Sequence, residues 1–131
     1  MNIRAIGTDI VAIQRMRELV ARYGARLPRR LLSSHERESL PANPEVQAAY
    51  MARRFAAKEA AVKALGTGIA RGVRFADLAV YHEPLGRPYL VLDGGAAQWA
   101  AWIGVAQCHL SLSDERDYAL AFVVLEGSAS R

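Results

Sequence analysis

The feature that most constrains the fold of this chain is one long predicted helix over residues 44–65. Asn43 and Pro44 fit the N-cap and the first helical residue, and Gly66 fits a C-terminal stop. The helix would extend roughly 33 Å. It is rich in alanine, which lets other elements approach closely but adds little burial per residue. A chain of 131 residues fits one domain, 1–131, and association of subunits would supplement its core.

The other predicted elements are short. An amphipathic helix begins at Ile13 and should end near Gly24 or before Pro28, and Ser33 with Glu36 has the spacing of a capping box that opens a short helix. Strand and turn patterns predict strands at 3–11, 76–82, 88–92, 108–113 and 118–126, a helix at 96–105, and a frayed tail at 127–131. This order predicts an α+β domain in which the long helix packs on a mainly antiparallel sheet.

The long helix carries charged side chains beside its apolar surface. On a helical wheel, Glu59 and Lys63 lie at the edge of an apolar face, which is made of Met51, Phe55, Val62 and Leu65. Because Glu59 and Lys63 are spaced i and i+4, one interpretation is an ion pair that stabilises the helix by roughly 0.2 to 0.5 kcal/mol. The alternative is that Glu59, at the border between core and water, serves a ligand.

Asp9 is an acid inside the first predicted strand, where an unpaired buried carboxylate would be costly. One possible partner is the amide end of the following helix, with Asp9 as its cap. The other is a divalent cation shared with Glu59, because magnesium favours hard oxygen ligands and commonly binds one or two carboxylates together with water and substrate phosphates. The residues by themselves leave both interpretations open.

The positive charge of the chain is almost all arginine. Seventeen basic residues stand against thirteen acidic ones, and only Lys58 and Lys63 are lysines, so an anionic partner is expected. Arg15, Arg22 and Arg26 fall within an arc of about 40° on the first helix and form a stripe. The stripe favours a docking surface for an acidic partner over a merely solvated face. A small nucleic-acid-binding module is the rival class, weakened by few aromatic residues and no known motif.

Other patterns exclude several kinds of site. The single Cys108 gives no disulfide framework, and it points away from His109 on the predicted strand, which argues against a Cys/His nucleophilic pair. His109 shares its strand face with Ser111 and Ser113. The turn Gly66-Thr67-Gly68 follows a helix and does not open one, so it is no helix N-terminal phosphate loop. Without a signal peptide or a long apolar run, we expect a soluble cytoplasmic protein that does not enter the membrane.

Taken together, several segments resemble the holo-acyl-carrier-protein synthase family of 4′-phosphopantetheinyl transferases. The similarity covers almost the whole chain: IGTDIVAIQRM, RLLSSHE, RFAAKEAAVKALGTGI, GRPYLVL and HLSLSDERDYALAFVV. The most specific part is the combination of G-x-D-I with F-x-x-K-E-A-x-x-K some fifty residues later. One departure is Asp114, where many members of the family have histidine after the serine.

The resemblance implies an enzyme that transfers the 4′-phosphopantetheine group of coenzyme A to a serine of apo acyl carrier protein in fatty acid biosynthesis, releasing adenosine 3′,5′-bisphosphate. It implies Mg²⁺ and a homotrimer whose active sites lie between subunits; a non-catalytic trimeric relative is the alternative. Carried onto matching positions, the metal ligands are Asp9 and Glu59, and the catalytic residues are Glu59 and Lys63. The coenzyme A contacts are Arg54, Lys63, Gly66, Thr67, Gly68, Pro88, His109 and Ser111, and the carrier-protein contacts are Arg15, Arg22 and Arg26.

Overall fold

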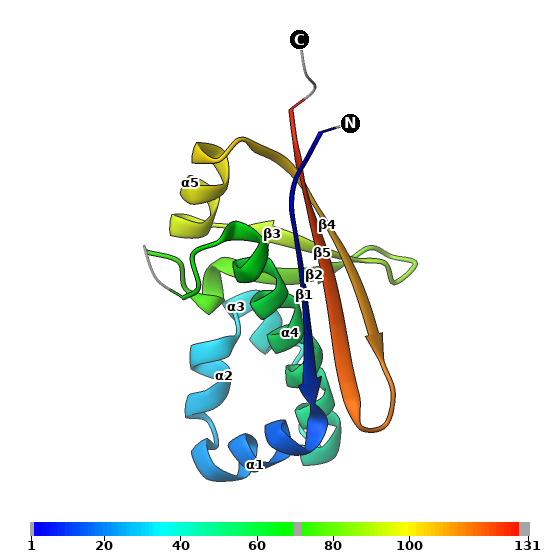
Figure 1. Ribbon diagram of the computed structural model, residues 1–131. Helices are drawn as coiled ribbons and strands as arrows, with labels where there is room; N and C mark the ends of the chain where they lie inside the picture. The colour runs from blue at the N-terminus through cyan, green and yellow to red at the C-terminus, as the bar shows by residue number, and fades with distance from the viewer. Residues whose placement is uncertain (1, 70–71, 129–131) are drawn as a thin grey trace.

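The computed structural model describes residues 2–69 and 72–128, and its elements follow the predicted order (Figure 1). The strands are β1 (Ile3–Ala12), β2 (Leu78–His82), β3 (Pro88–Leu92), β4 (Val105–Asp114) and β5 (Tyr118–Gly127). The helices are α1 (Ile13–Tyr23), α2 (Arg26–Leu31), α3 (Ser34–Glu38), α4 (Pro44–Leu65) and α5 (Gly94–Trp102), with a 3-10 turn η1 (Phe75–Asp77) before β2.

The strands form two antiparallel sheets. One has the order β1-β5-β4, so β1 and β4 are its edges, and the other is the β2–β3 hairpin. Helix α4 packs against β1 and β5, and α1 and α2 lie on the other side of α4 from the sheet (Figure 1). Helix α5 packs against β4. The arrangement confirms the predicted α+β fold with a long helix on an antiparallel sheet.

Helix α4 has the predicted ends. The Asn43 side chain accepts hydrogen bonds from the backbone N–H groups of Glu45 and Val46, and Gly66 ends the helix with a left-handed φ of 79°. The prediction of one apolar face was too narrow, because side chains from nearly every side of the helix are buried. Alanine makes this possible, since its small side chain lets the sheet, α1 and β2 approach α4 from different directions.

The closest approach between the sheet and α4 is at Gly7. A Cβ atom at this position would overlap the backbone carbonyl oxygen of Ala60 and crowd the backbone nitrogen of Ala64. Only glycine lets the two backbones lie so near one another. Gly7 is two residues before Asp9, and Ala60 directly follows Glu59. The contact therefore sets the separation of the two segments that carry the predicted metal ligands.

Several element ends differ from the predictions for local reasons. The strand predicted from residue 76 begins at Leu78, because the two residues before it belong to η1. Helix α5 begins at Gly94, where the Asp93 side chain caps it, and it ends at Trp102. Strand β4 starts earlier than predicted, at Val105.

Two further differences concern the end of the first helix and the end of the last strand. The first amphipathic helix stops at Gly24, and Leu27 is buried in the separate helix α2. The capping box of Ser33 and Glu36 is confirmed. Gly127 belongs to β5, so the expected tail is wrong at that residue, while 129–131 lie outside the described residues. Among residues 2–69 and 72–128, no helix is both long and apolar enough to cross a bilayer.

Candidate active site

The two predicted metal ligands come together where β1 lies on α4. Asp9 is on the face of β1 that points to the helix, between the exposed residues Thr8 and Ile10, and its side chain is 18% exposed. Burial raises the pKa of the Glu59 carboxyl, and the nearby Asp9 carboxylate raises it further, whereas Lys63 and Arg15 lower it. Two carboxylates from distant parts of the sequence thus share one partly buried place at the open edge of the sheet.

Lys63 completes this group, but with a different partner from the one predicted by helix spacing. Its ammonium donates to Oδ1 of Asp9 at 2.9 Å and to the backbone oxygen of Thr8 at 3.0 Å. The i, i+4 pair with Glu59 is therefore not the contact that Lys63 makes. The interpretation of Asp9 as a cap is also wrong, because the N-cap of α1 is Ala12, whose side chain makes no capping hydrogen bond, and the Asp9 carboxylate accepts from Lys63.

The donor set suits a hard divalent cation. Both candidate ligands are carboxylates, and the pKa of Glu59 is raised by burial and by a like charge, so a cation between the two acids would offset an unfavourable charge. Within residues 2–69 and 72–128 there is no metal-binding group of three or more His, Cys, Asp or Glu. An ion held here would take its other oxygen ligands from water and from a bound substrate, the usual arrangement for magnesium with phosphates.

The predicted coenzyme A contacts fall into three groups. The turn Gly66–Gly68 follows α4 directly and lies near Lys63 in sequence and space. Arg54 is buried but lies near the β2–β3 hairpin. The pKa of His82 is lowered, first by burial and then by the charge of Arg54, and His82 pairs with Pro88 across that hairpin. His109 and Ser111 lie on the exposed face of the sheet, where Nε2 of His109 is 2.8 Å from Oε1 of Glu126.

Lys63, with Asp9, and the pair His109 and Ser111 are on opposite sides of the sheet. Asp9 and Lys63 lie on the helix-covered side at the β1 edge, while His109 and Ser111 lie on the outer side of β4, at the other edge. Strand β5 separates the two strands. One copy of the chain therefore does not bring all of the predicted coenzyme A contacts into one cleft.

The predicted arginine stripe divides between two helices. Gly24 ends α1, so Arg26 belongs to α2 and not to the same helix as Arg15 and Arg22. Arg22 and Arg26 nevertheless meet over the ring of Tyr23, with their guanidinium carbons 5.3 and 5.6 Å from its centre. Arg15 lies close enough to Glu59 to lower its pKa. The stripe thus runs from the acidic pair to Tyr23.

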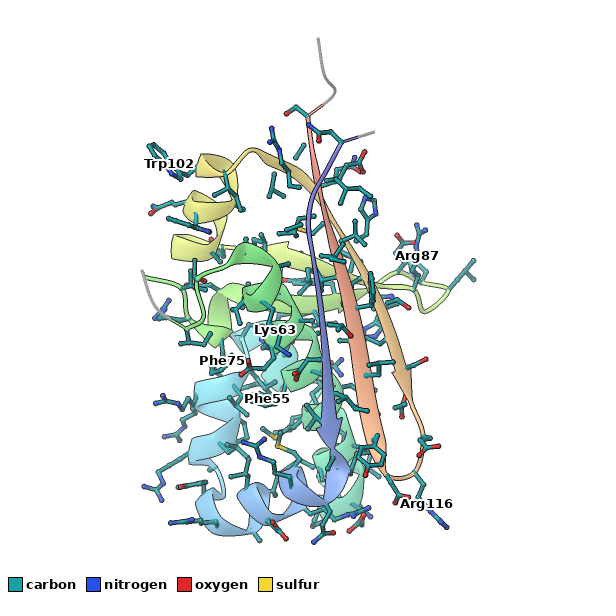
Figure 2. The ribbon with its side chains drawn as sticks, in the orientation of Figure 1. Phe55, Lys63, Phe75, Arg87, Trp102 and Arg116 are labelled. Carbon is teal, nitrogen blue, oxygen red and sulfur yellow. The ribbon has the colours of Figure 1, made fainter. Side chains whose placement is uncertain are left out.

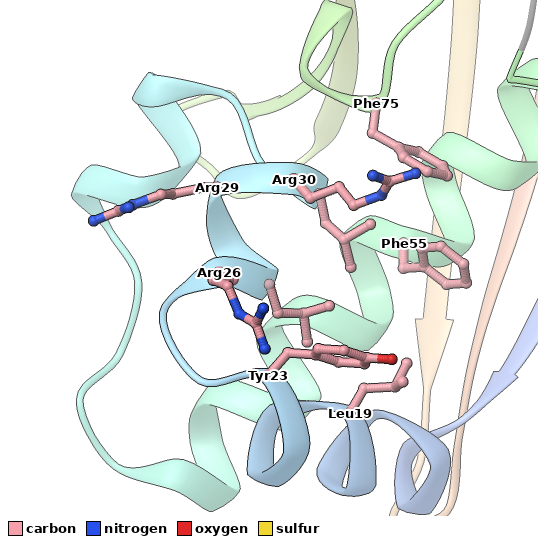
Figure 3. Close-up of a pocket in the computed structure, with 9 residues that line it drawn as sticks. Leu19, Tyr23, Arg26, Arg29, Arg30, Phe55 and Phe75 are labelled. Carbon is pink, nitrogen blue, oxygen red and sulfur yellow. The ribbon is translucent and has the colours of Figure 1, made fainter.

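A groove of about 840 Å³ opens beside Tyr23, between α1, α2, α4 and η1 (Figure 3). Its lining is mostly apolar with arginines at the rim: Leu19, Tyr23, Arg26, Leu27, Arg29, Arg30, Leu31, Phe55 and Phe75. Figure 3 shows the Arg30 side chain directed toward Phe75 and Arg29 directed away. Phe55 and Phe75 contact each other with ring centres 5.7 Å apart. The sequence patterns did not reveal this groove, because it is built from four separate segments.

A buried ionic cluster also escaped prediction. Lys58 and Glu36 are both fully buried, with Nζ of Lys58 2.7 Å from Oε1 of Glu36. Arg54 lies beside them, its Nε 3.9 Å from Oε2 of Glu36 and its guanidinium carbon 3.5 Å from the centre of the Tyr50 ring. The only sequence signal was the capping box, which located Glu36 at a helix start but did not indicate that a lysine of α4 would meet it.

Comparison with known proteins places this geometry in a family. The family model described as the 4′-phosphopantetheinyl transferase superfamily matches residues 5–123, and the chain belongs to that superfamily.

The relatives narrow this class to one activity. The holo-[acyl-carrier-protein] synthase of Alkalilimnicola ehrlichii is 58% identical over 94% of this chain and 96% of its own length. The crystal structure of the synthase from Neisseria meningitidis superposes with a TM-score of 0.86 at 39% identity, covering 95% of this chain and 98% of that one. The Helicobacter pylori synthase, solved in complex with coenzyme A, gives a TM-score of 0.80 at 29% identity, covering 92% and 99%.

Proposed function

We propose that this chain is a holo-[acyl-carrier-protein] synthase, which transfers the 4′-phosphopantetheine group of coenzyme A to a serine of apo acyl carrier protein and releases adenosine 3′,5′-bisphosphate. The observation that carries the proposal is the convergence of Asp9, Glu59 and Lys63 from β1 and α4 at one accessible place. The synthases that this chain resembles over nearly its full length, one of them with coenzyme A bound, support the same activity. Fatty acid biosynthesis in the cytoplasm is the setting that we propose.

The chain's own residues supply the positioning and charge that phosphoryl transfer requires. Asp9 and Glu59 would hold Mg²⁺, which when bound offsets negative charge on the diphosphate of coenzyme A. Lys63 is 55% exposed on its side chain, so its ammonium can leave Asp9 and donate to a phosphate oxygen. The carrier serine attacks the β-phosphorus, its oxygen forms the new P–O bond, and the bond to the leaving bisphosphate breaks. Glu59, partly buried beside Asp9, is placed to take the serine proton.

The separation of the coenzyme A contacts supports a site shared between copies of the chain. Lys63 and the turn after α4 would come from one subunit, and His109 with Ser111 from the outer sheet face of its neighbour. That face is apolar although no described element covers it: Ile6 is 60% exposed, Ile10 62% and Phe122 44%. These residues lie in register with the polar ones, because Phe122 pairs with both Thr8 and Ser111. A homotrimer with active sites at its interfaces would cover the apolar face and complete each site.

Phe122→Asp is expected to separate the subunits and to lower transfer by roughly 100-fold or more, because it places a charge in the middle of the apolar face. Light scattering should report a monomer, and a carrier-protein mass assay should report the loss of activity. Val46→Asp is a matched control, since Val46 is an exposed apolar residue of α4 outside the sheet face, and it should leave both properties unchanged. A monomeric Phe122→Asp variant with full activity would contradict the shared site.

The arginines around the groove support the docking of an acidic carrier protein. Arg26 lines the groove, and Arg22 lies over the ring of Tyr23, which also lines it. The groove offers apolar surface from Phe55 and Phe75. An acidic amphipathic helix would match this combination of a positive rim and an apolar floor. Arg15 links the groove to Glu59, so a carrier helix bound along it would end near the acidic pair.

Arg22→Glu and Arg26→Glu are each expected to raise the KM for carrier protein by roughly 5-fold or more, because each reverses a charge beside the groove. The KM for coenzyme A should stay constant. Arg116→Glu is the control, since Arg116 lies in the β4–β5 turn away from the groove (Figure 2). Steady-state kinetics at two salt concentrations would check the result, and an unchanged carrier KM in both variants would assign these arginines to solvent.

The direct test of the function is incubation of the chain with apo acyl carrier protein, coenzyme A and Mg²⁺, followed by mass spectrometry of the carrier. We expect the carrier to gain one phosphopantetheine group, and omission of Mg²⁺ to prevent it. An unmodified carrier would leave a non-catalytic relative as the better description. Binding of generic RNA or DNA without binding of coenzyme A would favour the nucleic-acid alternative.

A further inference from the structure

The buried carboxylate of Glu36 accepts hydrogen bonds from three separate parts of the fold. Oε1 accepts from the backbone N–H of Ser33 at 2.8 Å and from Nζ of Lys58 at 2.7 Å. Oε2 accepts from the backbone N–H of Val80 at 3.0 Å. Lys58 also donates to the backbone oxygen of Phe75 at 2.9 Å. One ion pair therefore connects α3, α4, η1 and β2.

Stability alone is a poor explanation for this ion pair. Removing two charges from water is costly, and replacing a buried pair by apolar side chains of similar volume is often neutral or stabilising. Burial lowers the pKa of Lys58, an effect that Glu36 opposes, which shows the same competition within this pair. What apolar side chains would not replace is direction, since each of these hydrogen bonds fixes both a distance and an angle.

Helix α4 has a particular need for directional contacts. Seven of its thirteen buried residues are alanines: Ala48, Ala52, Ala56, Ala57, Ala60, Ala61 and Ala64. Helices normally fix their relative rotation by packing ridges of large side chains into grooves, and alanine gives only shallow ridges. An alanine surface permits close approach, as at Gly7, but specifies the rotation of the helix about its axis weakly.

The rotation of α4 decides where Glu59 points. Lys58 and Glu59 are neighbours in the sequence, so the pairing of Lys58 fixes the direction of Glu59 about 100° further round the axis. A rotation of about 20° would move a carboxylate at the helix surface by about 2 Å. Metal ligands must lie within a few tenths of an ångström of their required distances. A small rotational error would thus separate Glu59 from the position that it shares with Asp9.

We propose that Glu36, acting through Lys58, is a positioning residue that fixes the rotation of α4 and so aims Glu59 at Asp9. The proposal rests on the function proposed above, because it assigns the ion pair to the geometry of that site. Neither Glu36 nor Lys58 contacts a substrate in this arrangement, since both side chains are fully buried. Tyr50, whose hydroxyl donates to the backbone oxygen of Glu36, ties the same segment of α3 to an earlier turn of α4.

The double variant Glu36→Gln, Lys58→Met tests this role, because the amide oxygen still accepts a backbone hydrogen bond while the ion pair is removed. We expect kcat to fall by roughly 10- to 100-fold, as for loss of residues that orient metal ligands, and the Kd for Mn²⁺ to rise at least about 10-fold by electron paramagnetic resonance. The carrier KM should stay constant. Glu45→Gln is the matched control, since Glu45 is also on α4 and the substitution removes its exposed 2.8 Å ion pair with Arg17 of α1.

Glu36→Asp provides a second test that retains the charge. The shorter side chain cannot keep all of its hydrogen bonds, so we expect a folded protein with a lower kcat and weaker Mn²⁺ binding. Val73→Ala, a truncation of a buried side chain outside the cluster, controls for lost stability alone. Wild-type kcat and wild-type Mn²⁺ affinity in Glu36→Asp, measured well below its Tm, would overturn the proposal even if the double variant did not fold. Absence of transfer by the wild-type chain would instead overturn the proposed function, and the relative Mn²⁺ affinities would then decide the inference.

Discussion

Replacement of Glu59 by glutamine is expected to lower kcat by roughly 1000-fold or more while the chain keeps its fold. Glutamine has nearly the same shape, but it removes one of the two carboxylates proposed to hold Mg²⁺ and the group placed to take the serine proton. Glu59 is only partly buried and makes no hydrogen bond that holds other described elements together, so its neutralisation should not unfold the protein. Transfer measured across a Mg²⁺ titration, beside circular dichroism, would check both halves of the expectation.

The pH dependence of stability provides an independent control for the same variant. The folded-state pKa of Glu59 is raised above its ordinary value of 4.5, so at pH values between the unfolded and the folded pKa, in the absence of Mg²⁺, the native state holds a proton that the unfolded state has released. Stability conferred by this group is therefore lost as pH rises from about 4 through the folded pKa. Glutamine does not titrate, so the Tm of Glu59→Gln relative to wild type should increase from pH 4 to pH 7.

A glutamine variant with wild-type activity in saturating Mg²⁺ would show that Glu59 is neither a required ligand nor the base. Glu45→Gln again serves as the control, because Glu45 lies on the same helix, is exposed and is remote from Asp9 in sequence and contact. The control should change neither kcat nor the pH dependence of Tm. Only a difference between the two variants can be attributed to the carboxylate at position 59.

Gly7→Ala is expected to destabilise the protein strongly. The new Cβ would overlap the carbonyl oxygen of Ala60, and because this oxygen belongs to the backbone of α4, the strand and the helix must move apart. Overpacking typically costs about 1 to 3 kcal/mol, and a clash with backbone atoms that cannot rotate away belongs at the upper end of that range. The Tm should therefore fall by roughly 10 °C.

The same substitution should also impair the site. Moving β1 from α4 increases the separation of Asp9 from Glu59, so we expect a higher Mg²⁺ concentration for half-maximal activity in the fraction that remains folded. Ala5→Ser is the control, because Ala5 lies on the same side of β1 but is only partly buried. Gly7→Ala with a wild-type Tm and an unchanged Mg²⁺ requirement would mean that the approach of β1 to α4 does not set the geometry of the acids.

Local signals in the sequence were sufficient for most of the fold. Asn43, Pro44 and Gly66 act within one turn of their own positions, so the ends of α4 could be predicted without knowledge of the rest of the chain. The start of α5 was missed although its signal is local, because the Asp93 side chain caps the helix through the N–H of the adjacent Gly94. The start of β2 was missed because the residues before it form the 3-10 turn η1. Helical periodicity failed for the interior of α4, since a helix surrounded on several sides has no single apolar face to detect.

The candidate site was predictable in its acids but not in its surroundings. Resemblance to a family indicated Asp9 and Glu59, and spacing on α4 indicated an incorrect partner for Lys63, because the true partner is fifty-four residues away on β1. The same limitation applies to Lys58. Its place on the helix does not predict burial, and the fold pairs it with Glu36 in the interior. Contacts between remote segments depend on tertiary structure, and short-range patterns carry no information about them.

The strand order has a consequence for how the protein is made. Strand β1 precedes the other described strands in the chain, yet within the described residues its strand partner is β5, which follows all of them. Until β5 has been made, the growing chain holds an unpaired β1 edge and a site whose first acid has no fixed place. Folding must therefore bring together two strands separated by all the other described elements, a topology that slows folding. A prematurely terminated chain lacking β5 would present the β1 edge to other nascent chains.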